Sequence, residues 1–385
     1  MSNGQTRVII AGGGIGGLTL AIALLREGFN VEVYERVAEL KEVGAAVTIF
    51  PNATNVLRAL GILDPLLEHS EIVAGALIRR RDGARLTYLE MTTRLGVPGI
   101  SLCRPDVLKV LADNVPPDRV HLGRAVSRFE QRSDGVVVHF ESGQSVQGDV
   151  LVGCDGLRSA VRDQQLGDGP PIYAGYTSWR GQTRLAAGKL KPGEAGETMC
   201  AATRVGIWPV GHGLTSWWVG ADEPERKSDE PEGRKAKLLR LCAGWHEPIE
   251  ELIAGCSDIL KTDLYDRRPI RGWSRGRVTL LGDAAHPMTP NMGQGACMAI
   301  EDAMILARCL KTYRDVPTAL ARYEDVRFDR TKMVVEEARN QGVVGQWKHP
   351  AAVFVRGLMF KHLLPVLGAR TAPKYYDYDA TTVPV

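Results

Sequence analysis

The chain has 385 residues, 44% of them apolar and 24% charged, and a formal net charge of +3. This composition predicts a globular protein of two or three domain-sized units, and the small net charge argues against a nucleic-acid partner. Seven scattered cysteines without a CxxC pair argue against a metal site or a disulfide framework, and favour a cytoplasmic location. No apolar stretch approaches the roughly 20 residues of a membrane span, so we expect no membrane partner.

The first 35 residues predict one βαβ unit. Residues 6–11 have the pattern of a buried strand, 18–27 have helical spacing, and 30–34 return to strand. A strand that begins by residue 7 leaves no room for a secretory signal before it.

Five glycines stand within six positions between that first strand and helix. In a GxGxxG fingerprint, Gly12 permits the tight turn, Gly14 lets a pyrophosphate approach the backbone, and Gly17 lets helix and strand pack closely. Glu35 ends the second strand, 18 residues after Gly17, where a carboxylate binds ribose hydroxyls. The unit therefore predicts a dinucleotide site, for NAD or for the ADP half of FAD.

Residues 73–171 mix hairpin and helix signals. Asp-Gly pairs at 82–83 and 134–135 each stand between β-like runs and predict turns. A helix is predicted over 105–114, with proline at its first position. An apolar strand then leads into Gly153–Arg162, which reads GCDGLRSAVR.

The second half begins with a region rich in tryptophan. The runs YTSWRGQTRL, VGIWPV and TSWWVGAD predict strands of a separate sheet, and five of the seven tryptophans lie within 172–270. A strand, the segment Gly282–Pro287 (GDAAHP) and a long helix over 296–310 follow. The tail from about 316 to 373 reads mostly as helix.

Three motifs now stand in a defined order along the chain. They are the glycine fingerprint at Gly12–Gly17, the segment Gly153–Arg162 and the segment Gly282–Pro287. Each of the last two alone is a common turn, but the three together resemble the class A FAD-dependent monooxygenases, the para-hydroxybenzoate hydroxylase type. The stretch 290–302, PNMGQGACMAIED, is similar to the single-component zeaxanthin epoxidase and urate hydroxylase-like aromatic hydroxylases.

The resemblance implies an α/β fold in which a Rossmann-type FAD-binding domain is interleaved with a mixed β-sheet substrate domain and followed by a helical C-terminal tail. The expected divisions are an FAD-binding domain in three parts (1–72, 101–171 and 271–315), inserted substrate-domain strands (73–100), a substrate domain (172–270) and a C-terminal helical region (316–385).

The resemblance also implies bound FAD. By likeness to the family, Asp283 holds the flavin ribityl chain, Asp155 serves the FAD pyrophosphate and NAD(P)H, and Arg104 contacts FAD. The loop 290–295 opens a helix whose free amides and dipole can stabilise negative charge on the flavin. The residues expected to bind FAD are Gly12, Gly14, Gly17, Glu35, Arg36, Ala46, Arg104, Val126, Asp155, Asp283, Pro290, Gly293, Gln294 and Gly295.

The implied reaction uses NADH or NADPH as a transient donor, because the chain has no second GxGxxG. It hydroxylates or epoxidises a small planar aromatic or unsaturated ring with O2, through a C4a-hydroperoxyflavin. The alternative enzyme is a flavin oxidase or reductase on the same fold without oxygen insertion. A flavin-binding module without catalytic activity and a plain NAD dehydrogenase also remain alternatives. A flavin-dependent halogenase is not expected, because this chain lacks the WxWxIP-type stretch that halogenases carry.

The tryptophan-rich region is expected to supply the substrate wall, from Tyr176, Trp208 and Trp217, although at least half of its aromatic residues should be core. Arg204 is expected to position the substrate, by likeness to the urate hydroxylases, and a surface salt bridge is its alternative role. Ser216 stands where those relatives have tyrosine and Asn291 where they have aspartate, so we do not expect urate as the substrate. The protein is expected to act as a monomer or homodimer.

Two further features have open roles. His286 is expected to be structural beside the flavin rather than catalytic. The tail 351–367 is apolar with interspersed basic residues. It could lie on a membrane or a dimer surface, or close over the core, and we expect the last of these.

Overall fold

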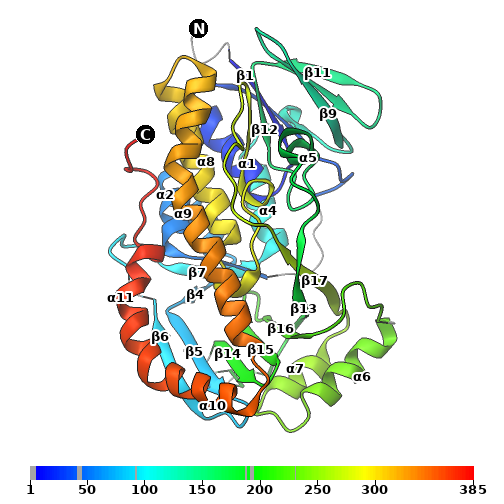
Figure 1. The fold of residues 1–385 in the computed structure, drawn as a ribbon, viewed down its shortest axis with the longest axis vertical. Coiled ribbons are helices and arrows are strands. Elements are labelled where there is room, and N and C mark those ends of the chain that lie inside the picture. The colour runs from blue at the N-terminus through cyan, green and yellow to red at the C-terminus, as the bar shows by residue number, and fades with distance from the viewer. Residues whose placement is uncertain (1–5, 41–45, 92, 187–188, 191–194, 230) are drawn as a thin grey trace.

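The computed structural model describes residues 6–40, 46–91, 93–186, 189–190, 195–229 and 231–385. A parallel sheet with its helices occupies one end of the molecule and a large mixed sheet the other, and the long helix α9 (Val316–Gly345) runs between them (Figure 1). The α/β architecture with a separate mixed sheet and C-terminal helices confirms the expected fold class.

The parallel sheet holds the glycine fingerprint. Its central strands are almost wholly apolar because both of their faces are covered. Helices α1 (Ile15–Arg26) and α8 (Gly295–Thr312) cover one face, and an antiparallel three-stranded sheet covers the other. In spatial order, the parallel strands are β18 (Val278–Leu280), β12 (Val150–Gly153), β1 (Arg7–Ala11), β2 (Asn30–Tyr34) and β8 (Val120–His121). The covering strands are β11 (Ser145–Gly148), β10 (Val136–Phe140) and β9 (Val126–Gln131).

The large sheet is mixed and seven-stranded. Its strand order brings the hairpin of residues 75–90 beside strands from the second half of the chain. One of its faces packs on α6 (Pro231–Leu241) and α7 (Ile249–Gly255) around a separate apolar core. In spatial order the strands are β17 (Leu260–Asp266), β13 (Ile172–Thr183), β16 (Thr215–Asp222), β15 (Thr203–Pro209), β14 (Gly196–Cys200), β5 (Gly75–Arg80) and β6 (Arg85–Glu90).

A small antiparallel sheet and four short helices join these two parts. The sheet order is β3 (Ala46–Ile49), β7 (Gly99–Cys103) and β4 (Ser70–Val73). The helices are α2 (Pro51–Ala59), α3 (Leu63–Leu67), α4 (Arg104–Asp113) and α5 (Ala160–Leu166).

The tail is helical, as expected, but it does not close over the core. After α9 come α10 (Pro350–Leu358), a π-helical turn (Met359–Leu363) and α11 (Leu364–Tyr376), which curve around the outside of β5 and β6 (Figure 1). Arg356 is the one buried residue from 350 to 376. The segment Pro350–Tyr376 is also long and apolar enough to cross a membrane by length and composition, contrary to our reading of the sequence. Because basic residues interrupt this segment, its sequence pattern indicated neither its exposure nor its length as an apolar helix.

Candidate functional site

The three sequence motifs meet at the carboxyl edge of the parallel sheet. Each follows one of three neighbouring strands, because β1 leads to Gly12, β12 to Asp155 and β18 to Asp283. Backbone hydrogen bonds join the loops: Cys154 N donates to the Ala11 carbonyl (2.7 Å) and Leu281 N to that of Gly153 (2.9 Å). Ligands of open α/β sheets bind at this edge.

The fingerprint glycines divide into two that the fold requires and one that leaves space. Gly12 has φ +114°, and a Cβ there would lie 2.3 Å from the Cys154 carbonyl oxygen. A Cβ on Gly17 would lie 2.0 Å from the Gly12 oxygen. By contrast, a Cβ on Gly14 would meet nothing within 4 Å. Helix α1 also begins without a side-chain cap, so its first amides face open space suited to a pyrophosphate.

Glu35 lies beside those glycines. Its Oε2 accepts a hydrogen bond from Gly13 N (2.6 Å), and its Oε1 accepts one from Val37 N (3.1 Å). Each oxygen keeps a lone pair for a ribose hydroxyl. The neighbouring Arg36 is exposed just after β2, next to the site rather than within it.

Asp155 has one oxygen engaged and one without a partner. Oδ2 accepts hydrogen bonds from the first amides of α5, Ala160 N (2.8 Å) and Val161 N (3.3 Å). Oδ1 is buried and has no hydrogen-bond partner. Burial raises the pKa of this carboxyl. An orphaned buried acceptor beside the glycine loop fits a residue that binds a ligand.

Asp283 follows β18 and lies close to the start of α8. The residue is open to solvent, yet the surrounding protein atoms desolvate its carboxyl enough to raise its pKa, partly offset by His286 and Arg104. A Cβ on Gly295, the first residue of α8, would lie 3.8 Å from Asp283 Oδ1. Arg104, Asp283 and the start of α8, predicted from separate motifs, are therefore neighbours.

The loop before α8 packs against residues at the start of α2. Gly293 has φ +64°, and a Cβ there would come within 2.9 Å of the Phe50 ring. Gln294 is buried, and its Oε1 accepts a hydrogen bond from Asn52 Nδ2 (3.0 Å). No side chain caps α8, so its N-terminal amides remain available at the loop where Pro290 begins a 3-10 turn.

A buried ion network lies beneath this loop, and sequence reasoning missed most of it. Arg327 Nε donates to Asp302 (2.6 Å), and its Nη1 donates to Glu301 (2.6 Å). Arg330 makes two further 2.6 Å hydrogen bonds to Glu301. His286 is bonded to Asp302 Oδ2 (2.6 Å), a structural position. Both arginines face one side of α9, but nothing local in the sequence pairs α9 with α8.

We predict that Asp302 makes stability depend on pH below 4. Burial alone would raise its pKa, but His286 and Arg327 lower that pKa to about 2. A folded-state pKa below the unfolded value of about 3.9 adds stability that is present above pH 4 and lost as the pH falls toward 2. The loss should be about 2–3 kcal/mol.

The measurement is the free energy of unfolding of wild type and Asp302→Asn between pH 2 and 5. The difference between the two proteins should shrink as the pH falls, because asparagine cannot titrate. A constant difference across this range would contradict the prediction.

The second part of the site is the face of the mixed sheet opposite α6 and α7, on which the end of α9 and the loop before α8 also pack. Arg204, on β15, is only 3% exposed, which argues against a surface salt bridge. Its Nη2 donates to Asn291 Oδ1 (2.6 Å), and Asn291 Nδ2 donates to the Tyr176 hydroxyl (2.8 Å). Asn291 belongs to the loop before α8, so this contact joins the sheet to that loop. The guanidinium carbon lies 5.7 Å from the Tyr176 ring centre and 5.5 Å from that of Trp218.

The aromatic side chains divide between the two faces of the sheet. Trp217 is 1% exposed and belongs to the core beneath α6 and α7. Trp218, the next residue, therefore points to the Arg204 face. Trp208 is partly exposed and lies in register with Ser216, on that same face. We accordingly move the expected substrate contact from Trp217 to Trp218 and keep Tyr176 and Trp208.

Two expected FAD contacts lie at strand ends. Ala46 is the partly buried first residue of β3, which pairs with β7 ahead of Arg104. Val126 begins β9 in the covering sheet and packs against the apolar cluster beneath it. Neither position is joined to the glycine loop by a contact that the structure describes.

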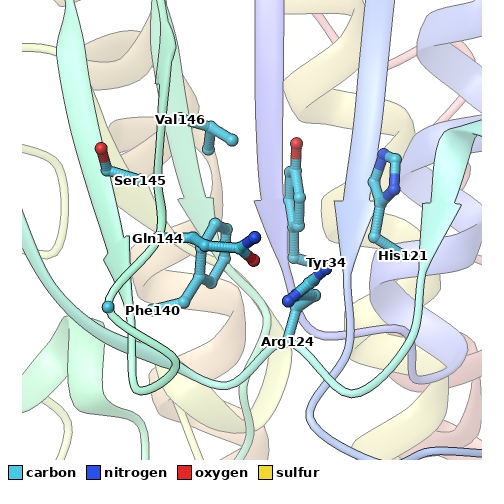
Figure 2. A pocket seen from close by; sticks show the side chains of 8 residues that line it. Tyr34, His121, Arg124, Phe140, Gln144, Ser145 and Val146 are labelled. Carbon is cyan, nitrogen blue, oxygen red and sulfur yellow. The ribbon is translucent and has the colours of Figure 1, made fainter.

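A hollow of about 570 Å³ lies apart from these motifs, between β2, β8 and the β10–β11 hairpin. In Figure 2, Tyr34 stands between Phe140 and His121, and the ring centres are 4.8 and 4.6 Å apart. Tyr34 and Glu35 are adjacent in sequence but point to different neighbours, Phe140 and Gly13 respectively. The lining of this hollow includes neither the fingerprint glycines nor Glu35, although Gly12 N donates to the Tyr34 carbonyl (2.8 Å) and Arg124 N to that of Glu35 (2.7 Å).

Comparison with known proteins agrees with the geometry. A sequence profile described as an FAD binding domain matches residues 5–338. The chain is 42% identical over 361 residues to the aurachin C monooxygenase/isomerase of Stigmatella aurantiaca, covering 92% of this chain and 94% of that protein. It is 35% identical over 347 residues to the FAD-dependent urate hydroxylase of Klebsiella pneumoniae, covering 87% and 89%.

A solved structure is similar over the same length. The crystal structure of Klebsiella pneumoniae HpxO with FAD and uric acid superimposes with a TM-score of 0.90 at 30% identity, covering 97% of each chain. These similarities confirm the family resemblance and FAD as the cofactor.

Proposed function

The chain belongs to the family of FAD-dependent aromatic monooxygenases, and from that premise we propose that it uses NADH or NADPH and O2 to hydroxylate or epoxidise a small planar ring compound. The relatives named above support oxidoreductase chemistry. The electron donor, the inserted oxygen and the ring are the proposed part.

One observation carries the proposal. The buried Arg204 lies against the rings of Tyr176 and Trp218 and bonds directly to Asn291 in the loop before α8. The face that can bind a flat ring is therefore joined to the loop assigned to the flavin. When bound, FAD supplies the redox and oxygen-transfer chemistry.

The chain's own residues have separate tasks in this proposal. Gly14 and the start of α1 bind the pyrophosphate, and Glu35 binds the ribose. Asp283 and Arg104 bind the flavin beside the start of α8, whose amides stabilise negative charge. Arg204 orients the substrate by charge and Trp218 by contact with its face. The division of the chain into an FAD-binding domain and a substrate domain is part of the same proposal.

The proposed substrate is an electron-rich ring with a hydrogen-bonding or anionic group, and it is not urate. Serine at 216 and asparagine at 291 put neutral side chains on the substrate face, where the resemblance places ionisable ones in urate hydroxylases. Asn291 already accepts from Arg204 and donates to the Tyr176 hydroxyl. Aurachin C, the compound in the name of the relative from Stigmatella, is the first compound to test.

The test measures NADH and NADPH consumption by the FAD-loaded enzyme with aurachin C, urate, 6-hydroxynicotinate and 3-amino-4-hydroxybenzoate, the compounds named for its relatives. Product mass is then measured under ¹⁸O₂. One labelled oxygen atom in a product supports the proposal. NADH or NADPH consumption that releases hydrogen peroxide and gives no labelled product would favour an oxidase or reductase instead.

Replacing Arg204 by methionine is expected to lower kcat/KM for the accepted substrate by about 30-fold. The fold should survive, because Glu197, whose carboxyl lies 3.8 Å from Arg204 and is 22% exposed, can be protonated. Burial raises the pKa of Glu197 and only Arg204 opposes that shift. The flavin absorbance should be unchanged.

The matched control is Arg339→Met. Arg339, on α9, pairs with the buried Asp266 at the end of β17 (2.6 Å) and makes no contact with the Arg204 face among the interactions described. Its kcat/KM should stay within about threefold of wild type. Equal losses in both variants would assign Arg204 a structural role only.

A further inference from the structure

The C-terminal segment Pro350–Tyr376 gathers apolar side chains on the surface. Among the described residues, six of the thirteen exposed large apolar side chains lie in it, and Phe354 is 68% exposed. Only 6% of its most apolar stretch is buried. A contiguous apolar surface of this kind marks an interaction site. We call these residues the apolar strip: Phe354, Val355, Leu358, Leu363, Val366 and Leu367.

The π-helical turn brings the strip onto one side of the helix. Phe354, Val355 and Leu358 share a face of α10 by their spacing of one and four residues. Leu363, Val366 and Leu367 repeat that kind of spacing in α11. In an uninterrupted α-helix the second group would point away from the first. Leu358 and Leu363 are five residues apart, and the intervening π turn (Met359–Leu363) supplies the extra residue that realigns them.

The opposite side of the segment is fixed to the protein. The buried Arg356 donates to the carbonyls of Gly345 (2.7 Å) and Cys200 (2.8 Å). At the other end, Arg330 donates to the Lys374 carbonyl (2.7 Å). Between them, a Cβ on Gly368 would lie 3.3 Å from the Leu89 side chain of β6. Anchored at both ends, the segment cannot cross a bilayer without leaving the body of the protein.

The charges of the segment have a single sign. Residues 350–376 contain Arg356, Lys361, Arg370 and Lys374 but no aspartate or glutamate. Lys361, Arg370 and Lys374 are exposed. An apolar face with basic residues is the pattern of helices that lie in the interface of a membrane, where anionic lipids attract the cations.

A second copy of the chain fits this surface less well. In a two-fold dimer the same patch meets itself. Three exposed cations would then face the same three cations, without an acidic side chain of the segment to pair with them. The crevice beside the strip also lacks polar side chains, since it is lined by Met359, Phe360, Leu363, Leu364 and Leu367.

We propose that the apolar strip is a membrane-docking surface, on which the protein rests on an anionic lipid bilayer with α10 and α11 lying in the plane of the interface. The proposal does not depend on which ring compound the enzyme oxidises.

The test is sedimentation of the FAD-loaded full chain with two kinds of vesicle, phosphatidylcholine alone and phosphatidylcholine with about one third phosphatidylglycerol. Wild type should bind the anionic vesicles, and binding should weaken as salt rises. The triple variant Phe354→Ser, Leu358→Ser, Val366→Ser should bind them about 30-fold more weakly.

A second triple variant separates charge from apolar contact. Lys361→Gln, Arg370→Gln, Lys374→Gln should weaken binding to anionic vesicles about 10-fold and leave binding to neutral vesicles unchanged. The matched control is Ile72→Ser with Ile172→Ser, which removes exposed apolar side chains outside the strip and should bind like wild type. All variants should keep the flavin absorbance, because the changed side chains are exposed.

Three results would overturn the proposal. Wild type could fail to sediment with anionic vesicles even at low salt. The strip variant could bind as well as the control. Light scattering could instead show a dimer that the strip substitutions dissociate, which would make the strip a contact between copies.

Discussion

Replacing Gly14 by alanine is expected to weaken FAD binding by about 100-fold while the protein still folds. The backbone at Gly14 has φ −77° and ψ −174°, an extended conformation that alanine adopts freely. A Cβ there meets no protein atom within 4 Å, so the apoprotein has room for it. It would occupy the space through which the pyrophosphate approaches α1. The measurement is FAD affinity by flavin fluorescence, together with the thermal midpoint of the apoprotein.

Two other glycines make the comparison specific. Gly357→Ala also adds a methyl group where nothing lies within 4 Å, but far along the chain in α10, and should leave FAD affinity unchanged while raising the thermal midpoint slightly through helix propensity. Gly17→Ala would place its Cβ 2.0 Å from the Gly12 oxygen and should destabilise the fold itself. Wild-type FAD affinity in Gly14→Ala would show that the pyrophosphate does not lie at this glycine.

The meeting of the three motifs at one edge could be predicted from the sequence because each motif directly follows a strand. Gly12, Asp155 and Asp283 are far apart in the chain, but parallel neighbouring strands bring their ends to one edge. The helix α1 was expected to begin at residue 18, and it begins at Ile15 because the last fingerprint glycines form its first turn.

The substrate face was harder to predict, for a physical reason. Alternation along a strand shows that Trp217 and Trp218 point to opposite faces, but not which face receives helices. Here α6 and α7 cover the Trp217 side. The tail posed a related difficulty, because the π turn after Leu358 breaks the helical period on which a reading of amphipathicity depends.

The ion network under α8 had no sequence signal at all. Glu301 and Arg327 are 26 residues apart, and their contact depends on how α9 lies against α8. Local patterns describe the face of one helix, and they contain no information about its register against another. The network also reaches the segment before Asp283, because Gly282 N donates to Asp302 Oδ2 (3.0 Å).

Replacing Arg327 by methionine is therefore expected to lower the free energy of unfolding by about 3–5 kcal/mol. Arg327, Glu301 and Asp302 are all 0% exposed, and the arginine bonds both carboxylates at 2.6 Å. Without it, the carboxylate of Asp302 keeps only His286 as a side-chain partner among the described residues. The cost arises from leaving a buried charge uncompensated rather than from lost packing, since methionine fills much of the same space. Chemical denaturation of the apoprotein measures it.

Two comparisons test that cause. Arg271→Met breaks an exposed pair with Asp325 (2.8 Å) on the same helix and should cost no more than about 0.5 kcal/mol. The double variant Arg327→Met, Asp302→Asn should be less destabilised than the sum of its single variants, because it removes the stranded carboxylate together with its partner. Strict additivity would instead assign the loss to packing. A recovery in the double variant that also restores FAD affinity would show that the network positions the amides of α8 for the flavin.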